Sequence, residues 1–445
     1  MKFLFTAIFT WIFAVTLFAQ KPHEVLATAT GLTFTPASLS EDTRKLFLNQ
    51  TSVVAAERTR LLSQMVSDLL LDAEAKSLSV TRDALVTAEL KKVAVPTELE
   101  IKQVFEANRA NFGDKTIDDV RKQIVAFLKQ NAQQKAVSDL VAGLKTKFRF
   151  LAGKDINAAD LKPIESVFSI AGKSVSAQEF VDRYKADIYD IRAQISDQII
   201  GDLENTIFLT LVSQEAKSQN IDAGDVIAAD ITNKMRDFSD DERAGLENAF
   251  RKKLFAKYVV KLLVHEPEAV AHNVSVDDDP FIGKATAPVT VVMFSDFQCS
   301  ACSATHPVFR KVLAEYGDKI RFVVRDFPLE SLHENAFRAA LAANAARVQG
   351  NFFEYTEILY HNQDNLDDAS LKKYAADLGL NIKQFELDFS SEKTAAEVRK
   401  DITDGNEYGV RGTPTIFING VKVNRLSAEG FRAAIDRSLA RSTSK

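Results

Sequence analysis

An internal repeat in the first two thirds of the chain constrains the fold more than any other feature of the sequence. Residues 30–35 (TGLTFT) correspond to residues 171–176 (AGKSVS), and residues 73–77 (AEAKS) correspond to residues 214–218 (QEAKS). An offset of 141 residues separates the members of both pairs, so the segments between them match without a net gap. In each copy, a short strand and a Gly turn precede long stretches with the apolar periodicity of helices. The repeat therefore predicts two mainly α-helical modules of the same design.

The two helical modules are predicted at residues 20–150 and 163–264. Pro36 is placed to open the first helix of the first copy, and Ser176 and Glu179 have the spacing of a capping box in the second. This pattern resembles the helical N-terminal region of SurA-type export chaperones, with spacers too short for a peptidyl-prolyl isomerase domain. The resemblance implies binding of unfolded clients, but a spacer or a homodimerisation module fits the same pattern.

The first 19 residues have the layout of a secretory signal peptide. Lys2 precedes an apolar run at residues 3–18, and the small residue Ala19 follows. Because the run is shorter than the ~20 apolar residues of a spanning helix, cleavage after Ala19 is favoured over an uncleaved membrane anchor. The sequence therefore predicts a periplasmic or secreted protein.

Composition narrows the class of protein. Apolar residues make up 46% of the chain and charged residues 26%, the balance of a globular protein with a packed core. A length of 445 residues predicts several domains. The formal net charge of -5 offers no basic surface for nucleic acid, so a nucleic-acid partner is set aside.

The chain has two cysteines, Cys299 and Cys302, separated by Ser300 and Ala301. A disulfide across so short a loop restrains the unfolded chain little, so structural stabilisation is a poor explanation for the pair. A zinc site would need four ligands, and the nearest His is the lone His306, with no second CxxC or HxxxH motif. No metal or other cofactor is predicted, and a redox-active dithiol in an oxidising compartment is the favoured interpretation.

The residues around the dithiol predict a strand followed by a helix. Residues 287–294 (APVTVVMF) form a β-branched apolar run bounded by Pro, and a helical pattern extends from about Cys299 to Glu315. A helix N-terminus stabilises an anion, so the pKa of Cys299 should be lowered and its thiolate should be the nucleophile. Cys302, one turn later, is placed to resolve a mixed disulfide.

A second motif lies near the end of the chain. Residues 411–423 (RGTPTIFINGVKV) predict a turn, a strand, an Asn-Gly hairpin turn and a second strand, and a helix begins at about Ser427. Residues 265–280 are acidic and contain proline, which predicts a linker before a C-terminal domain at residues 281–445.

Together, residues 283–309, 326–363 and 409–423 resemble the DsbA-like branch of the thioredoxin superfamily. The resemblance implies an α/β thioredoxin fold at the C-terminus, with a helical insertion at about residues 332–408. It also implies that Pro414 is a cis-proline facing the dithiol, and that Thr413 lends backbone groups to an extended substrate segment.

The sequence departs from that family at two places. Met293 stands where thioredoxin and DsbA carry a buried acid, six residues before the first Cys. Asp296, three residues before it, is a possible proton relay, although a helix cap or a solvated residue fits this position equally. The dipeptide between the cysteines lacks the His of the strongest oxidases, so the redox potential cannot be ranked. His306 is expected to be an ordinary, partly exposed residue.

The predicted function is an exported thiol-disulfide oxidoreductase, with Cys299, Cys302, Thr413 and Pro414 at its site. Its direction as oxidase, reductase or isomerase is open. Cysteine-containing or unfolded exported proteins are the expected partners, together with a membrane-bound redox partner. The alternative is a periplasmic holdase-type chaperone in which the helical modules bind clients and the redox domain is secondary. A dithiol adaptor that senses oxidants is a third interpretation.

Overall fold

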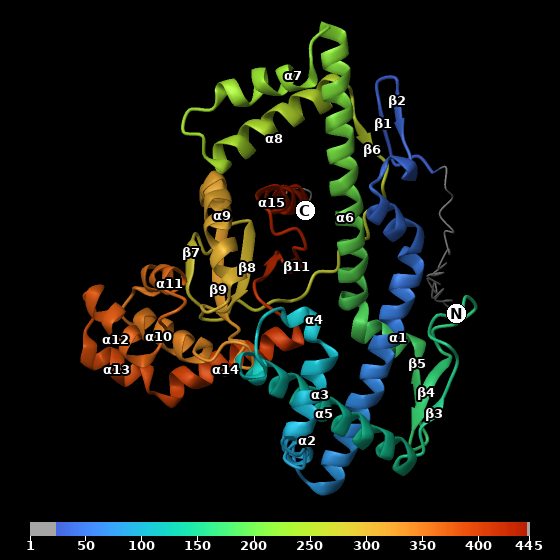
Figure 1. Ribbon diagram of the computed structural model, residues 1–445, viewed down its shortest axis with the longest axis vertical. Coiled ribbons are helices and arrows are strands. Elements are labelled where there is room, and N and C mark those ends of the chain that lie inside the picture. Colours follow the sequence, from blue (N-terminus) through green and yellow to red (C-terminus); the bar gives the residue numbers. More distant parts are fainter. Residues whose placement is uncertain (1–23, 443–445) are drawn as a thin grey trace, which may run out of the picture. The chain divides into compact units, whose positions relative to one another are not determined.

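The computed structural model describes residues 24–442, so the predicted signal peptide at residues 1–19 lies outside the described residues. The chain divides into two compact units (Figure 1). Of the described residues, 51–184 belong to the first, and 24–50 and 185–442 belong to the second. Among residues 24–442, no helix combines the length and the apolar character that crossing a bilayer requires.

The first unit is helical and carries one small antiparallel sheet in the strand order β3-β4-β5. Its elements are most of α1 (Glu41–Leu78), α2 (Arg82–Leu90), α3 (Glu98–Ala107), α4 (Arg109–Phe112), α5 (Ile117–Lys147), β3 (Leu151–Ala152), β4 (Ser166–Ile170) and β5 (Lys173–Ser176). Ile101 and Phe105 of α3 pack against Val120 and Ile124 of α5 in a buried cluster. Helix α3 is thus held by apolar contacts with α5.

The N-terminal hairpin belongs to the second unit, together with the long helix of the second repeat copy. The elements here are β1 (Ala27–Ala29), β2 (Leu32–Phe34), η1 (Pro36–Ser38), most of α6 (Ala177–Gln219), α7 (Ala223–Asp230), η2 (Thr232–Lys234), α8 (Asp240–Lys257) and β6 (Lys261–Leu262). The strand order is β2-β1-β6, and both pairings are antiparallel. Ala27 is the register partner of both Phe34 and Leu262.

The sheets join the two copies of the repeat, which the sequence analysis did not predict. Strand β6, at the end of the second copy, pairs with β1 of the first, and β3, which follows the first copy, pairs with β4 of the second. The backbone groups of a two-residue strand need hydrogen-bond partners on a neighbouring strand. For both β3 and β6, these partners come from the hairpin of the other copy. The compact units therefore do not follow the predicted module boundaries at 20–150 and 163–264.

The repeat itself is present in the structure. Gly31 and Gly172 occupy equivalent hairpin turns with φ of +73° and +80°, which favours glycine at both positions. The capping box of the second copy forms as predicted: Glu179 N donates to Ser176 Oγ at 3.2 Å and Ser176 N donates to Glu179 Oε2 at 2.7 Å. Pro36 differs from its prediction, because it opens the short helix η1, and α1 begins only at Glu41.

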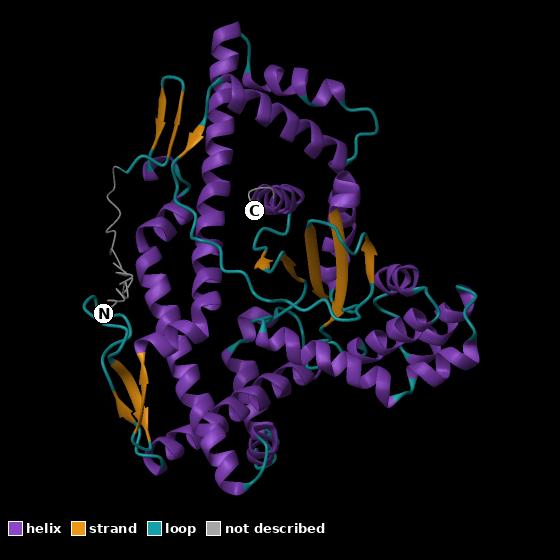
Figure 2. Cartoon of the chain, turned by 180° about the vertical axis from the view of Figure 1, so that it is seen from behind, coloured by secondary structure: helices purple, strands orange, loops and turns teal. Residues whose placement is uncertain are grey.

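The C-terminal domain is built on a five-stranded sheet in the order β11-β10-β8-β9-β7, seen from behind in Figure 2. Its strands are β7 (Phe281–Gly283), β8 (Val289–Ser295), β9 (Ile320–Asp326), β10 (Thr415–Ile418) and β11 (Val421–Lys422). Strands β8 and β9 are parallel, and the other pairs are antiparallel. Helix α9 (Ser300–Tyr316), the short η3 (Gly317–Lys319) and α15 (Ala428–Ser442) complete the α/β framework.

The predicted helical insertion is present between β9 and β10. It consists of α10 (Ala336–Val348), α11 (Phe352–His361), α12 (Asp368–Asp377), α13 (Ile382–Phe389) and α14 (Glu392–Glu407). Phe352 and Tyr355 of α11 and Phe385 of α13 are buried in the same apolar cluster as Val291 and Met293 of β8. The insertion therefore shares a core with the sheet.

A buried ion cluster lies on the other side of this sheet. The Arg325 side chain on β9 is fully buried, and its Nη2 lies 2.7 Å from Asp404 Oδ2. Its Nε lies 2.9 Å from both Asp401 Oδ1 and Asp279 Oδ2. One guanidinium cannot neutralise three carboxylates, and burial together with the nearby Asp401 raises the pKa of Asp279 to about 8. Arg325 thus ties β9 to α14 and to the segment that precedes β7.

Candidate active site

Cys299 lies at the N-terminus of α9, directly after the turn that leaves strand β8. The turn closes when Asp296 Oδ1 accepts the N–H of Gln298 at 2.8 Å, and Cys299 is the N-cap residue of α9. The backbone N–H groups of Ala301 and Cys302 point at the Cys299 sulfur, as expected for unsatisfied donors in a first helical turn. The sulfur is therefore held by groups that favour an anion.

The two thiols have opposite electrostatic environments. Hydrogen bonds, first from the Cys302 thiol and then from Thr413 and backbone amides, lower the pKa of Cys299 to about 5, although burial opposes the shift. Burial, and then the hydrogen bond with Cys299, raises the pKa of Cys302 far above its ordinary value. Both cysteines are buried, but Cys299 is 8% exposed and Cys302 is 0% exposed, so the residue whose pKa is lowered is also the less buried one.

The loop before β10 lies against the dithiol. Strand β10 pairs with β8 in a register that sets Thr415 opposite Phe294, which brings the preceding residues close to Cys299. The Thr413–Pro414 peptide bond is cis, and the Cys299 sulfur lies 3.5 Å from the Thr413 carbonyl oxygen. The structure thus brings together Cys299, Cys302 and the Thr413–Pro414 pair.

Asp296 is buried, but its carboxylate does not contact either thiol. Its Oδ2 accepts the N–H of Leu329 at 2.9 Å and lies 2.7 Å from His333 Nδ1. Only the backbone N–H of Asp296 hydrogen-bonds the Cys302 sulfur. Sequence reasoning did not identify His333, which is 37 residues away and has no motif of its own. A relay role for Asp296 stays a prediction.

Two hydroxyl groups near Cys302 were also missed by the sequence analysis. The Ser295 side chain hydrogen-bonds the Cys302 sulfur, and Ser295 Oγ lies 2.6 Å from Tyr360 Oη. In addition, Gln363 Nε2 donates to the carbonyl oxygen of Cys299 at 2.9 Å. Tyr360 and Gln363 come from the helical insertion, where no local pattern distinguishes them from core or surface residues.

The expectation that His306 is partly exposed is wrong. His306 is 3% exposed, its Nε2 lies 2.8 Å from Glu357 Oε1, and its ring packs on Tyr360 with 4.8 Å between centroids. Helix α11 of the insertion covers this face of α9. Burial lowers the pKa of His306, with Glu357 opposing the shift.

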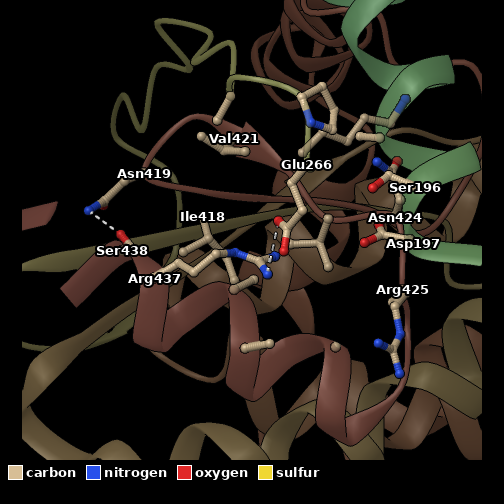
Figure 3. Close-up of a pocket in the computed structure, with 18 of the residues that line it drawn as sticks. Ser196, Asp197, Glu266, Ile418, Asn419, Val421, Asn424, Arg425, Arg437 and Ser438 are labelled. Atoms are coloured by element: carbon tan, nitrogen blue, oxygen red, sulfur yellow. Dashed lines mark hydrogen bonds and ion pairs between the residues drawn. The ribbon is translucent and has the colours of Figure 1, made fainter. Parts of the chain in front are cut away.

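A separate cavity of about 810 Å³ lies in the second unit (Figure 3). It is lined by residues of α6, the linker, β11 and α15. At its wall, Arg437 Nη1 lies 3.6 Å from Glu266 Oε2, and Asn419 Nδ2 donates a hydrogen bond to Ser438 Oγ at 2.7 Å. Neither cysteine lines it, so the cavity is distinct from the dithiol site. In the described part of the chain, no group of three or more His, Cys, Asp and Glu side chains is arranged to hold a metal ion.

The strand pairing and the dithiol at the start of α9 define a thioredoxin-fold domain with a CxxC site. A family model described as Thioredoxin matches residues 275–437, so the predicted thioredoxin fold of the C-terminal region is confirmed.

Known proteins resemble parts of this chain. A Na(+)/H(+) antiporter NhaA 1 from Mycolicibacterium gilvum (strain PYR-GCK) is 39% identical over 140 residues, which is 31% of this chain and 23% of that protein. The chain spans about a quarter of the length of the curated relatives that it matches. Oxidised BdbD from Bacillus subtilis is 24% identical, with a TM-score of 0.35 over 39% of this chain and 100% of that chain. Alpha-DsbA1 from Wolbachia pipientis is 22% identical, with a TM-score of 0.34 over 38% of this chain and 96% of that chain.

Proposed function

We propose that the protein exchanges disulfides with exported proteins through Cys299 and Cys302. The observation that carries the proposal is the difference between the two sulfurs: hydrogen bonds lower the pKa of Cys299 to about 5, whereas Cys302 is fully buried. An accessible thiolate beside a buried thiol is the arrangement that nucleophilic attack followed by internal resolution requires.

The exchange proceeds through one mixed disulfide. The Cys299 thiolate attacks a client disulfide, forms a new S–S bond and releases one client sulfur as a thiolate. Cys302 then attacks the Cys299 sulfur, which releases the second client sulfur and leaves a Cys299–Cys302 disulfide. Two electrons pass from the dithiol to the client, and the reverse sequence oxidises a client dithiol. The Thr413–Pro414 segment is proposed to orient the client backbone beside Cys299.

The direction of exchange follows from the reduction potential of the dithiol against glutathione. A value near the thioredoxin potential, about -270 mV, favours a reductase, and one near the DsbA potential, about -120 mV, favours an oxidase. Export of the chain and a membrane-bound redox partner are parts of this proposal. Cell fractionation with the full-length chain tests the export.

The pH dependence of Cys299 alkylation tests the thiolate directly. The rate of single addition of iodoacetamide, followed by mass spectrometry on the reduced protein, is expected to reach half its maximum near pH 5, because the pKa of Cys299 is lowered to about 5. Removing the principal donor with Cys302→Ala should move that midpoint upward. A midpoint near pH 8.5, the ordinary value for cysteine, in the unsubstituted protein would contradict the proposal.

A further inference from the structure

The buried thiol Cys302 must gain or lose a proton in each exchange cycle. When a client thiolate attacks the oxidised dithiol at Cys299, the sulfur of Cys302 leaves as an anion inside the protein. Such an anion is costly at a site with 0% exposure, so a proton must reach it. Met293, six residues before Cys299, is buried and cannot supply that proton. The carboxylate of Asp296 hydrogen-bonds elsewhere, to backbone amides and to His333.

A pair of buried hydroxyl groups lies between Cys302 and the interior of the domain. Ser295 hydrogen-bonds the Cys302 sulfur, and its Oγ lies 2.6 Å from Tyr360 Oη. The ring of Tyr360 is fixed between Phe297 and His306, with centroid distances of 5.4 Å and 4.8 Å. Each hydroxyl can donate one proton while it accepts another, so the pair can pass a proton without moving heavy atoms.

A buried carboxyl group lies on the next strand. Asp326 of β9 is the register partner of Ser295 in the parallel β8–β9 pair, so both side chains leave the same face of the sheet. Asp326 is 5% exposed, and its Oδ2 accepts a hydrogen bond from Asn344 Nδ2 at 2.5 Å. Its Oδ1 is buried and has no hydrogen-bond partner among the described residues. The charge of Asp326 also acts on Tyr360.

We propose that Asp326 exchanges a proton with Cys302 through the hydroxyl groups of Ser295 and Tyr360. The inference rests on the proposed function, because it concerns the proton of the same dithiol. When Cys302 leaves as a thiolate, Ser295 gives it a proton and Tyr360 replaces the proton of Ser295. The Asp326 carboxyl group, whose Oδ1 has no hydrogen-bond partner among the described residues, then turns toward Tyr360 Oη and replaces the proton of Tyr360. The net change is one proton moved from Asp326 to Cys302, and in the opposite direction of exchange the same proton returns.

The surroundings of Asp326 suit a carboxyl group that holds a proton. Burial, followed by the charge of Asp401, raises its pKa well above the ordinary value, while Asn344 opposes the shift. The charged or titratable groups that act on Asp326 or Tyr360 from neighbouring elements are Asp279, Asp296, Arg347, Asp401 and Cys302. Two carboxylates, Asp401 and Asp279, act on Asp326 against the one guanidinium of Arg347, so the protonated form of Asp326 is favoured until a neighbouring sulfur becomes anionic.

The relay is tested by the rate at which dithiothreitol reduces the Cys299–Cys302 disulfide between pH 5 and 9. Samples are quenched in acid and labelled with a maleimide, and mass spectrometry then measures the fraction of protein with free thiols. After correction for the dithiothreitol thiolate, Asp326→Asn and Tyr360→Phe should each be slower than the unsubstituted protein at pH 7 by about a hundredfold, the lower end for a lost general acid. Their corrected rates should not change with pH, whereas that of the unsubstituted protein should fall as Asp326 ionises.

Asp404→Asn is the matched control. Asp404 belongs to the Arg325 ion cluster but makes no contact with the hydroxyl pair, and its substitution should leave the corrected rates unchanged. Tyr360→Phe keeps the ring between Phe297 and His306, so it decides the outcome even where Asp326→Asn fails to fold. Corrected rates equal to those of the unsubstituted protein in a folded Tyr360→Phe variant would overturn the relay. Absence of a reducible disulfide in the unsubstituted protein would instead refute the proposed function.

Discussion

Cys299→Ser is expected to abolish disulfide exchange. The substitution removes the sulfur whose pKa is lowered to about 5, and Cys302 cannot take its place because it is 0% exposed and its pKa is raised by burial. With glutathione disulfide as the oxidant, the rate of thiol loss followed by mass spectrometry should fall by at least about a thousandfold, in line with losing a thiolate nucleophile.

Cys302→Ser is the informative partner for this experiment. It keeps the Cys299 nucleophile but removes the resolving thiol, so a mixed disulfide between Cys299 and glutathione should accumulate and be visible as a mass increase. Residual exchange in Cys299→Ser at a tenth or more of the original rate would show that Cys299 is not the nucleophile.

The same variant separates the enzymatic proposal from the chaperone alternative. If the two helical modules bind unfolded clients, the Cys299→Ser variant should suppress client aggregation as well as the unsubstituted protein does, since both thiols lie in the C-terminal domain. Light scattering of a cysteine-free client protein measures the suppression of aggregation. Equal loss of exchange and of aggregation suppression would tie both to the dithiol.

Arg325→Met is expected to destabilise the C-terminal domain by about 3–5 kcal/mol, the cost typical of breaking a buried ion pair by removing one partner. The Met side chain fills much of the same space, so the cost comes chiefly from the buried carboxyl groups of Asp279 and Asp401, which lose their ion pair, whereas Asp404 keeps Lys400 at 3.0 Å. Their desolvation is then uncompensated in the folded state but is relieved on unfolding.

The Cys302 thiol provides a probe of this domain alone. In a Cys299→Ser background it is the single thiol in the chain, and its 0% exposure means that it should react with a maleimide only when the domain opens. Its labelling against urea concentration gives the unfolding free energy. The control is Arg399→Met, which removes an exposed ion pair with Glu392 and should change stability by less than about 1 kcal/mol. Equal midpoints for the two variants would contradict the structural role of Arg325.

Much of the C-terminal domain could be predicted from local sequence because its signals are local. A β-branched run before Cys299 predicts a buried strand, and the Asn419–Gly420 turn predicts the final hairpin, whose residues have φ of +46° and +79°. The position of Cys299 at a helix N-terminus follows from the same pattern. These features depend on residues only a few positions apart.

The surroundings of the buried thiol could not be predicted in this way. Ser295 and Tyr360 contact each other beside Cys302 only because the insertion folds back over α9, and Asp326 lies opposite Ser295 only because β8 and β9 pair in parallel. The same covering by α11 buries His306, which the sequence alone placed partly in solvent.

The repeat, the order of the elements and the lowered pKa of Cys299 could be predicted from local sequence patterns. Tertiary structure decided how the copies of the repeat share strands, with β6 completing the sheet of β1 and β3 that of β4. The physical reason is that helix periodicity, caps and turns act over a few residues. Strand pairing and burial depend on contacts between distant segments, which the chain makes only when it is folded.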